Sequence, residues 1–147
     1  IALVIGERLS RGASPADALR AIAGVTAACD VTARDLQRRD PTFARGKSFD
    51  SFCPLGPAVR VDAELDELVV VTRVNGLERQ RGHVSEMLFG FAELLVYAAR
   101  MMTLEPGDLV LTGTPAGVGT LAPGDRVEVE VSGVGVLANP VEARVQT

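Results

Sequence analysis

The sequence predicts a mixed α/β fold that is rich in β-structure, a roll of short strands with few helices. Most apolar segments are short and end at glycine, proline or Asn-Gly, as strands in meandering sheets do. Two similar turns, Glu105-Pro-Gly-Asp108 and Ala122-Pro-Gly-Asp125, each precede a strand pattern. Only two segments carry helix signals, so a β-rich roll fits better than a sheet with alternating helices.

Composition and charge narrow the possible functions. The chain has 147 residues, 47% of them hydrophobic, which suits a single domain with a core over residues 1–147. A formal net charge of -4 argues against a nucleic-acid partner. Without an apolar run of about 20 residues we expect no membrane contact and a soluble, cytoplasmic protein. The two cysteines, Cys29 and Cys53, fit a reducing compartment, and we expect buried free thiols.

The first half of the chain shows a strand, a helix, a second strand and a loop. Residues 1–6 read as the back half of a buried strand, so we expect further residues upstream. Ser14 is a predicted helix cap with proline next to it, and Gly24 is the predicted end of that helix. Residues 25–29 predict a buried strand. The loop 46–57 is rich in phenylalanine and is expected to pack inward.

The second half predicts a hairpin, a helix and further strands. Asn75-Gly76 between apolar runs predicts a hairpin over 68–81, because both residues accept positive φ. Ser85 is the predicted cap of a helix that runs to about residue 102. Its apolar stripe would contain Leu88, Phe91, Leu95 and Ala98. Strands are expected at 109–112 and 126–131.

A polar octet, Asp30 to Gln37, follows directly on the buried strand. A carboxylate at the end of a strand can point into a cleft while its backbone stays fixed. Asp30 would suit Mg²⁺, Mn²⁺ or Ca²⁺, although a metal site needs further carboxylates. The alternative is that Asp30 and Asp35 pair with Arg34 or cap a turn.

Three further sites carry chemistry-bearing residues. Lys47 lies ahead of two phenylalanines and either faces a carboxylate or substrate, or is an exposed lysine. The glycine that a phosphate-binding loop needs before Gly46 is missing, which excludes a nucleotide site. Residues 112–119 offer hydroxyls and amides for a carboxylate or carbonyl oxygen, or form a plain turn. His83, the one histidine, is read as structural or surface-exposed, with no nucleophile elbow nearby.

Taken together, these segments resemble the fumarylacetoacetate hydrolase family. The resemblance rests on the ordered motifs IALVIG, CDVTARDLQ, GKSFDSFCPLGP, VNG, MTLEPGDLVLTGTPAGVG and PGDRVEVEVSGVGVLANPV, which span nearly all 147 residues. It implies the C-terminal catalytic domain of that family, a mixed β-sandwich roll with a few helices that generally forms a homodimer. Relevant members include 2-hydroxyhepta-2,4-diene-1,7-dioate isomerases, 5-oxopent-3-ene-1,2,5-tricarboxylate decarboxylases and acylpyruvate hydrolases.

The resemblance also implies the site residues. Members hold Mg²⁺, Mn²⁺ or Ca²⁺ through three carboxylates, of which Asp30 matches the third. The other two, a Glu-x-Glu pair, would precede Ile1, as would the family's lid with its catalytic histidine and glutamate. By the same resemblance Lys47 is catalytic beside the metal, Gln37, Gly113 and Thr114 bind substrate, and Arg34, Asp35 and Ser51 are supporting residues.

The implied function is metal-dependent chemistry on small 2-oxo or 2,4-dioxo dicarboxylates, through an enolate that the cation and Lys47 stabilise. An isomerase or decarboxylase of the 2-hydroxyhepta-2,4-diene-1,7-dioate type in aromatic catabolism is favoured. An acylpyruvate (fumarylpyruvate-like) hydrolase or an oxaloacetate decarboxylase is the alternative. The rival from another class is a catalytically silent binding or assembly domain; a Glu-x-Glu before Ile1 would favour the enzyme, and its absence the silent domain.

Overall fold

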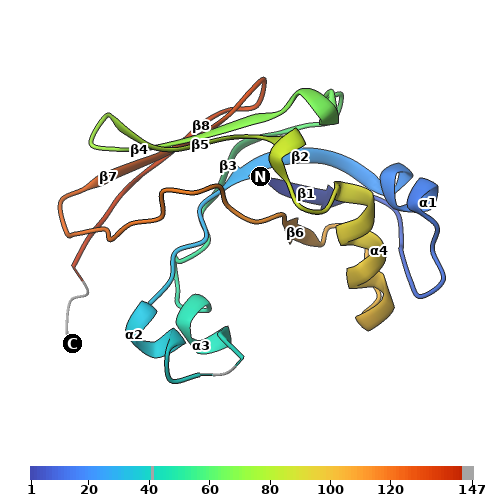
Figure 1. The fold of residues 1–147 in the computed structure, drawn as a ribbon, viewed down its shortest axis with the longest axis horizontal. Coiled ribbons are helices and arrows are strands. Elements are labelled where there is room, and N and C mark those ends of the chain that lie inside the picture. Colours follow the sequence, from blue (N-terminus) through green and yellow to red (C-terminus); the bar gives the residue numbers. More distant parts are fainter. Residues whose placement is uncertain (41, 144–147) are drawn as a thin grey trace.

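Two four-stranded antiparallel sheets packed face to face form the body of the protein (Figure 1). The computed structural model describes residues 1–40 and 42–143. The first sheet has the order β3-β2-β1-β6 and the second β5-β4-β7-β8. The strands are β1 (Ala2–Ile5), β2 (Ile22–Ala28), β3 (Leu55–Arg60), β4 (Val69–Val74), β5 (Leu77–His83), β6 (Leu109–Leu111), β7 (Arg126–Val131) and β8 (Gly135–Pro140). This arrangement confirms the predicted β-rich mixed fold.

Four helices and two short 3₁₀ turns complete the described residues. They are α1 (Pro15–Arg20), α2 (Arg34–Gln37), α3 (Ala44–Lys47), α4 (Phe91–Met101) and the turns at Leu65–Glu67 and Val84–Glu86. Helices α1 and α4 pack together at one end of the sheets, whereas the single-turn helices α2 and α3 form a lobe that stands away from them (Figure 1). Two of the four helices, α2 and α3, were not predicted, because one turn leaves no helical period to detect.

The core lies between the sheets and continues under α1 and α4. Alternate residues of β7 point inward, so Val127, Val129 and Val131 are buried in the same cluster as Leu3 of β1 and Leu95 of α4. The side chains between them face out. Burial of this apolar surface is the main force that holds the two sheets together.

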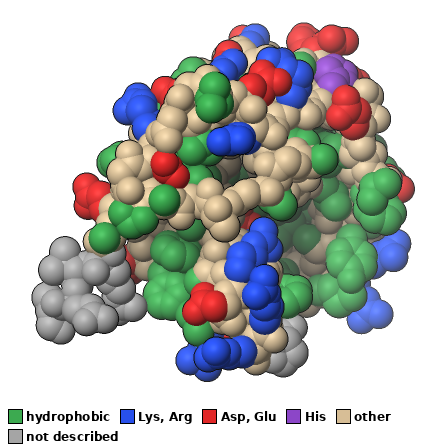
Figure 2. Space-filling view, turned by 60° about the vertical axis from the view of Figure 1, so that its left-hand side comes forward, with side chains coloured by type: hydrophobic (Ala, Val, Ile, Leu, Met, Phe, Trp, Pro, Cys, Tyr) green, Lys and Arg blue, Asp and Glu red, His purple; other side chains and the backbone are tan. Residues whose placement is uncertain are grey.

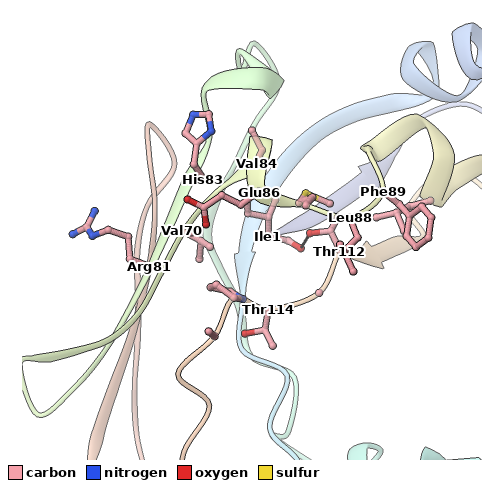
Figure 3. A pocket seen from close by; sticks show the side chains of 16 residues that line it. Ile1, Val70, Arg81, His83, Val84, Glu86, Leu88, Phe89, Thr112 and Thr114 are labelled. Atoms are coloured by element: carbon pink, nitrogen blue, oxygen red, sulfur yellow. Dashed lines mark hydrogen bonds between the residues drawn. The ribbon is translucent and has the colours of Figure 1, made fainter.

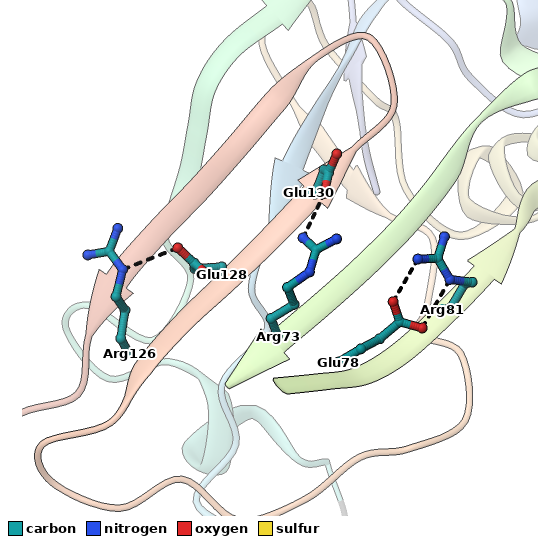
Figure 4. A network of polar contacts seen from close by, with 6 residues as sticks. All are labelled: Arg73, Glu78, Arg81, Arg126, Glu128 and Glu130. Atoms are coloured by element: carbon teal, nitrogen blue, oxygen red, sulfur yellow. Dashed lines mark hydrogen bonds and ion pairs between the residues drawn. The ribbon is translucent and has the colours of Figure 1, made fainter. Parts of the chain in front are cut away.

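The outer face of the second sheet carries several charged pairs (Figure 4). An Arg73 nitrogen lies 2.6 Å from a Glu130 oxygen on the neighbouring strand. Within β5, Arg81 donates to both carboxylate oxygens of Glu78, at 3.0 and 2.6 Å. Arg126 pairs with Glu128 at 3.2 Å on β7. This face is therefore built for solvent.

The first helix begins as predicted and ends early. Ser14 and Asp17 form a reciprocal capping box, and the Ser14 hydroxyl, with Arg20, holds the pKa of Asp17 well below its usual range. The predicted end at Gly24 is wrong, since α1 ends at Arg20 and β2 begins at Ile22. Gly24 is a strand residue, where a Cβ would lie 2.6 Å from the Arg60 carbonyl oxygen. The close approach of β3, and not a helix end, requires this glycine.

The hairpin is confirmed. Asn75 and Gly76, with φ of 53° and 77°, connect β4 to β5 in the conformation of a two-residue primed turn. The Asn75 side chain also donates to Asp125 at 2.8 Å and accepts from the Arg126 amide at 2.9 Å. The turn is therefore tied to the start of β7.

The predicted start of the second helix at Ser85 is wrong. Helix α4 starts at Phe91, after Gly90, whose amide donates to the Glu93 carboxylate at 3.0 Å. Ser85 is in a 3₁₀ turn, where its amide donates to the His83 ring. Leu88 therefore lies outside the helix and is 93% exposed. The buried stripe contains Phe91, Leu95 and Ala99, and the predicted member Ala98 packs against the core only partly buried.

The phenylalanine-rich loop does not pack into the core as predicted. The rings of Phe49 and Phe52 pack on each other, with centroids 5.2 Å apart. Phe49 remains 38% exposed. The loop stands with α2 and α3 outside the sandwich, so its aromatic residues form a small local cluster.

Substitution of Leu95 by alanine tests the core assignment. We expect the free energy of unfolding to fall by about 2–5 kcal/mol, because a fully buried leucine leaves a cavity between α4 and the sheets. Chemical denaturation of the purified protein measures this change.

Tyr97→Ala on the same helix is the matched control, because that side chain is 63% exposed. Its effect should stay within about 0.5 kcal/mol. Equal losses for the two variants would contradict the placement of the α4 stripe.

Candidate functional site

Asp30 lies just beyond β2, in backbone that remains paired to the segment before β3. The Cys29 amide donates to the Pro54 carbonyl oxygen at 3.1 Å, and the Val31 amide donates to the Phe52 carbonyl oxygen at 2.9 Å. The sheet therefore holds the main chain on both sides of Asp30. A carboxylate attached to such a fixed backbone is suited to a binding site.

The lobe of α2 and α3 brings Lys47 to Asp30. The Lys47 ammonium forms an ion pair with the Asp30 carboxylate and donates to the Thr32 hydroxyl at 3.3 Å. The Lys47 side chain is 36% exposed and that of Asp30 44%. Of the two readings of Lys47, the structure supports the one in which it faces a carboxylate.

Close packing of the two short helices places Lys47. Gly46 is buried, and a Cβ there would lie 3.3 Å from both the Ala33 carbonyl oxygen and the Gln37 Cβ. The Ala33 amide also donates to the Gly46 carbonyl oxygen at 2.8 Å. A glycine ahead of the lysine thus lets α3 lie against α2 with the ammonium directed toward Asp30.

The supporting residues are arranged differently from the prediction. Arg34 donates to the Gln37 side-chain oxygen at 2.7 Å, three residues along the same helical turn. Within the described ranges Arg34 forms no ion pair with Asp35, because adjacent helix residues point in different directions. Ser51 is exposed with a φ of 66°, and its hydroxyl makes no hydrogen bond inside residues 1–40 and 42–143.

The other predicted site residues, Gly113 and Thr114, follow β6. Thr112 donates through its amide and its hydroxyl to the Ile1 carbonyl oxygen, at 3.1 and 3.0 Å, which fixes the start of this loop against β1. Gly113 then has a φ of 107°, a backbone conformation that residues with a side chain rarely adopt. Thr114 follows on a loop anchored to the sheet.

A pocket of about 500 Å³ lies over this loop (Figure 3). Thr112 and Thr114 line one side, and the other is lined by His83, the last residue of β5, and by Glu86 just after it. The His83 ring nitrogen Nδ1 bonds to the Ser85 hydroxyl at 2.8 Å and accepts from the Ser85 amide. These local bonds agree with the structural reading of His83.

Gln80 of β5 is a contact of the loop that the sequence did not reveal. Its side-chain amide donates to the Thr114 hydroxyl at 2.7 Å and to the Pro115 carbonyl oxygen at 2.8 Å. Gly82 and Gly117 let the loop and the strand approach each other, since their Cβ atoms would lie 2.9 Å from Pro115 Cβ and 2.0 Å from the Arg79 carbonyl oxygen. The one sequence signal that could have indicated Gln80 is its place as a polar residue on a strand with alternating side chains.

Two groups of predicted site residues thus lie on either side of β1. Strand β1 is central, with Ala2 opposite Thr26 of β2 and Leu111 of β6. Because both neighbours run antiparallel to β1, Asp30 and Thr114 leave the sheet at the same edge, where Ile1 lies. Asp30 and Lys47 are not among the residues that line the pocket beside Thr114.

The chemistry of Asp30 can be compared with what a cation site needs. Within residues 1–40 and 42–143, no group of three or more His, Cys, Asp or Glu side chains could hold a metal ion. Asp30 has the hard oxygen donors that Mg²⁺ or Mn²⁺ prefers and is anchored by the sheet. Its donor atoms therefore fit one ligand of a cation site, which would need further ligands.

Both cysteines are free and lie near Asp30. Burial, followed by the Asp30 charge, raises the pKa of the Cys29 thiol. The same causes raise the pKa of Cys53, with a partial offset from Lys47. The expectation of two buried thiols is wrong for Cys53, which is exposed on the loop that stands off the core.

Comparison with known proteins gives consistent matches over the whole domain. Residues 1–142 match the family described as fumarylacetoacetate (FAA) hydrolase C-terminal. The 5-carboxymethyl-2-hydroxymuconate delta-isomerase of Mycobacterium smegmatis superposes with a TM-score of 0.94 at 42% identity, over 99% of this chain and 57% of that one. The 2-hydroxyhepta-2,4-diene-1,7-dioate isomerase of Mycobacterium marinum gives 0.91 at 42%, over 96% and 56%. The oxaloacetate tautomerase YisK of Bacillus subtilis is 41% identical over 96% of this chain and 50% of its own length.

The chain thus spans little more than half the length of these three relatives. Within the described residues no helix is long and apolar enough to cross a membrane.

Substitution of Gly117 by alanine tests how the Thr114 loop is held. The methyl group would meet the Arg79 carbonyl oxygen, and a φ of 101° disfavours alanine, so we expect a loss of stability of about 1–3 kcal/mol. Amide hydrogen exchange should also rise across 112–119. Both measurements use the purified protein.

Gly119→Ala is the control in the same loop, because no atom lies within 4 Å of the added Cβ. It should leave stability and exchange almost unchanged. If Gly117→Ala behaved in the same way, the loop would not be held by close contact with β5.

Proposed function

The chain belongs to the fumarylacetoacetate hydrolase family, and from this premise we propose that it is the catalytic domain of an enzyme that acts on small 2-oxo acids with a divalent cation. The observation that carries this proposal is the Asp30–Lys47 ion pair at the edge of the sheet where Thr114 also emerges. A carboxylate, an ammonium and a hydroxyl gathered at one edge suit an anionic oxygen-rich substrate.

We propose that two glutamates before Ile1 complete the cation site. Each step back along β1 is one step forward along both neighbours, since Ala2 faces Thr26 and Leu111. In that register the residue directly before Ile1 would face Ala28 and Gly113, and the residue two positions earlier would face Asp30. Facing residues of adjacent strands point to the same side of a sheet, about 5 Å apart. A Glu-x-Glu there would converge on the Asp30 carboxylate.

The cation, Mg²⁺ or Mn²⁺ with Ca²⁺ as a further candidate, would stabilise negative charge that develops on the ketone oxygen of the substrate. The residues of this chain would bind and orient the acid. Lys47 supplies a positive charge fixed by Asp30 and Thr32. Thr114 offers a hydroxyl to a substrate oxygen, and Gln37, held by Arg34, offers its side-chain amide.

Residues 30–50 carry five Lys and Arg side chains and four Asp side chains, so the lobe has a small positive charge. Arg34, Arg38, Arg39 and Arg45 are all exposed on or beside α2 and α3. In Figure 2 the lower lobe carries Lys and Arg side chains next to a hollow in the body. We propose that the exposed arginines help to attract a carboxylate substrate, more strongly at low salt.

Proton movement next to the ketone is the favoured reaction, as in a 2-hydroxyhepta-2,4-diene-1,7-dioate isomerase. Relatives named as an isomerase and as an oxaloacetate tautomerase support it, because both change the position of a proton beside a 2-oxo group. Decarboxylation and hydrolysis of acylpyruvates are the alternatives within the same site. Assay of the full-length protein with Mg²⁺ on unsaturated 2-oxo diacids, oxaloacetate and acylpyruvates separates them, and no turnover of any would contradict the proposal.

A homodimer is part of the proposal. Leu88 and Phe89 are 93% and 59% exposed at the rim of the pocket, which is unusual for adjacent large apolar side chains. A second copy that covered them would remove this surface from water. Monomeric full-length protein in sedimentation equilibrium would contradict it. A cytoplasmic location and a role in aromatic catabolism remain predictions.

Asp30→Asn and Lys47→Met in the full-length protein test the two assigned roles. We expect Asp30→Asn to lose Mn²⁺ binding measured by calorimetry, because an amide is a weaker ligand for a hard cation than a carboxylate. Lys47→Met should keep the cation and lower kcat by about 100-fold or more.

Asp50→Asn and Arg11→Met are the controls, since both residues are exposed and neither has a role in the proposed site. They should change neither cation affinity nor kcat by more than a few-fold. Undiminished Mn²⁺ affinity in Asp30→Asn would remove Asp30 from the cation site.

A further inference from the structure

We propose that Gln80 is a positioning residue that sets the direction of the Thr114 hydroxyl, so that Thr114 donates a hydrogen bond to a carboxylate or ketone oxygen of the substrate. This inference rests on the proposed function and adds to it a residue of β5, on the second sheet. It starts from the two hydrogen bonds that the Gln80 side chain makes.

The orientation of the Gln80 amide is fixed by its partners. The same end of the side chain lies 2.8 Å from the Pro115 carbonyl oxygen and 2.7 Å from Thr114 Oγ1. A carbonyl oxygen can only accept, so this end is the NH₂ group. One of its two hydrogens goes to Pro115 and the other to Thr114.

The Thr114 hydroxyl is therefore an acceptor toward Gln80. An amide nitrogen does not accept hydrogen bonds, so the Thr114 hydroxyl cannot donate a hydrogen bond to it. The proton must turn away from Gln80, and Thr114 is exposed on the pocket. Within the described residues, this hydroxyl donates to no protein acceptor. It is thus a donor held ready for an oxygen that enters from the pocket.

The contact of the loop with β5 keeps this geometry in place. Gly82 and Gly117 both allow approach closer than a side chain would permit, at Pro115 and at the Arg79 carbonyl oxygen. Gln80 lies between these two contacts. The hydroxyl is thus oriented before substrate arrives, which lowers the entropic cost of binding.

Two substitutions at position 80 distinguish a role in orienting the Thr114 hydroxyl from a role in holding the loop. Gln80→Glu replaces the donor by an acceptor, which would draw the Thr114 proton toward position 80. Gln80→Met removes both hydrogen bonds and leaves the hydroxyl free to rotate. The probe is oxalate, which presents only acceptor oxygens, and its binding to full-length protein with Mg²⁺ is measured by calorimetry.

We expect oxalate to bind about 10- to 100-fold more weakly to Gln80→Glu, and only a few-fold more weakly to Gln80→Met. A glutamate would also repel the Pro115 carbonyl oxygen, so a purely structural role predicts a loss of the same size with or without the Thr114 hydroxyl. In a Thr114→Val background the effect of Gln80→Glu should shrink to the repulsion between the added charge and oxalate. Glu78→Gln is the control on the same strand and should bind oxalate as the wild type does.

The outcomes distinguish this inference from the proposed function. The proposed function and the role of Gln80 are both supported by three results together. Wild type binds oxalate, Asp30→Asn does not, and Gln80→Glu binds it more weakly only when the Thr114 hydroxyl is present. If Gln80→Glu binds as well as wild type, or loses the same factor without the Thr114 hydroxyl, the role of Gln80 is overturned and the function stands. If wild type with Mg²⁺ binds no oxalate, both are overturned.

Discussion

The position of β1 between β2 and β6 is the constraint on which the site depends. This strand is hydrogen-bonded on both sides, and most of its residues are buried. Its register is therefore fixed, because a slip of one position would turn every side chain to the other face of the sheet. The two segments that bear Asp30 and Thr114 leave the sheet beside its first residue. Their separation is therefore set by the spacing of strands and not by the loops.

The second sheet supports the same edge from a different direction. Its strand β5 holds the Thr114 loop through Gln80, while its inward valines close the core above β1 and β2. The site is thus assembled from both layers of the sandwich. Charged pairs on the outer face keep the opposite side of that sheet in water, so β5 has one face for packing and loop contacts.

Local patterns predicted those elements whose cause is local. The Asn75-Gly76 turn needs positive φ at both residues, and β7 alternates valine with glutamate, so each could be recognised from a few neighbouring residues. The errors came from tertiary contacts. Gly24 is required by the close approach of β3, which helix signals cannot show, and α4 starts late because residues after β5 bond to the His83 ring.

The same distinction applies to the site. A buried strand that ends in an aspartate, and a lysine between a glycine and aromatic residues, made Asp30 and Lys47 candidates, and the structure places them in contact. The family resemblance selected Thr114 and Gln37. Neither the local patterns nor the family resemblance could show that Arg34 bonds to Gln37 and not to Asp35. They also could not show that Gln80 contacts Thr114, which is 34 positions away in the sequence. Those contacts depend on how the lobe and the two sheets come together.

The glycine contacts behind the Thr114 loop have a consequence for how such a domain can diversify. Because the back of the loop is fixed by the absence of side chains, a residue on its pocket side, such as Ala116, can change in size and polarity while the threonine stays where it is. Related enzymes built this way could acquire new substrate preferences by altering the front of the loop alone, with the chemical apparatus inherited intact.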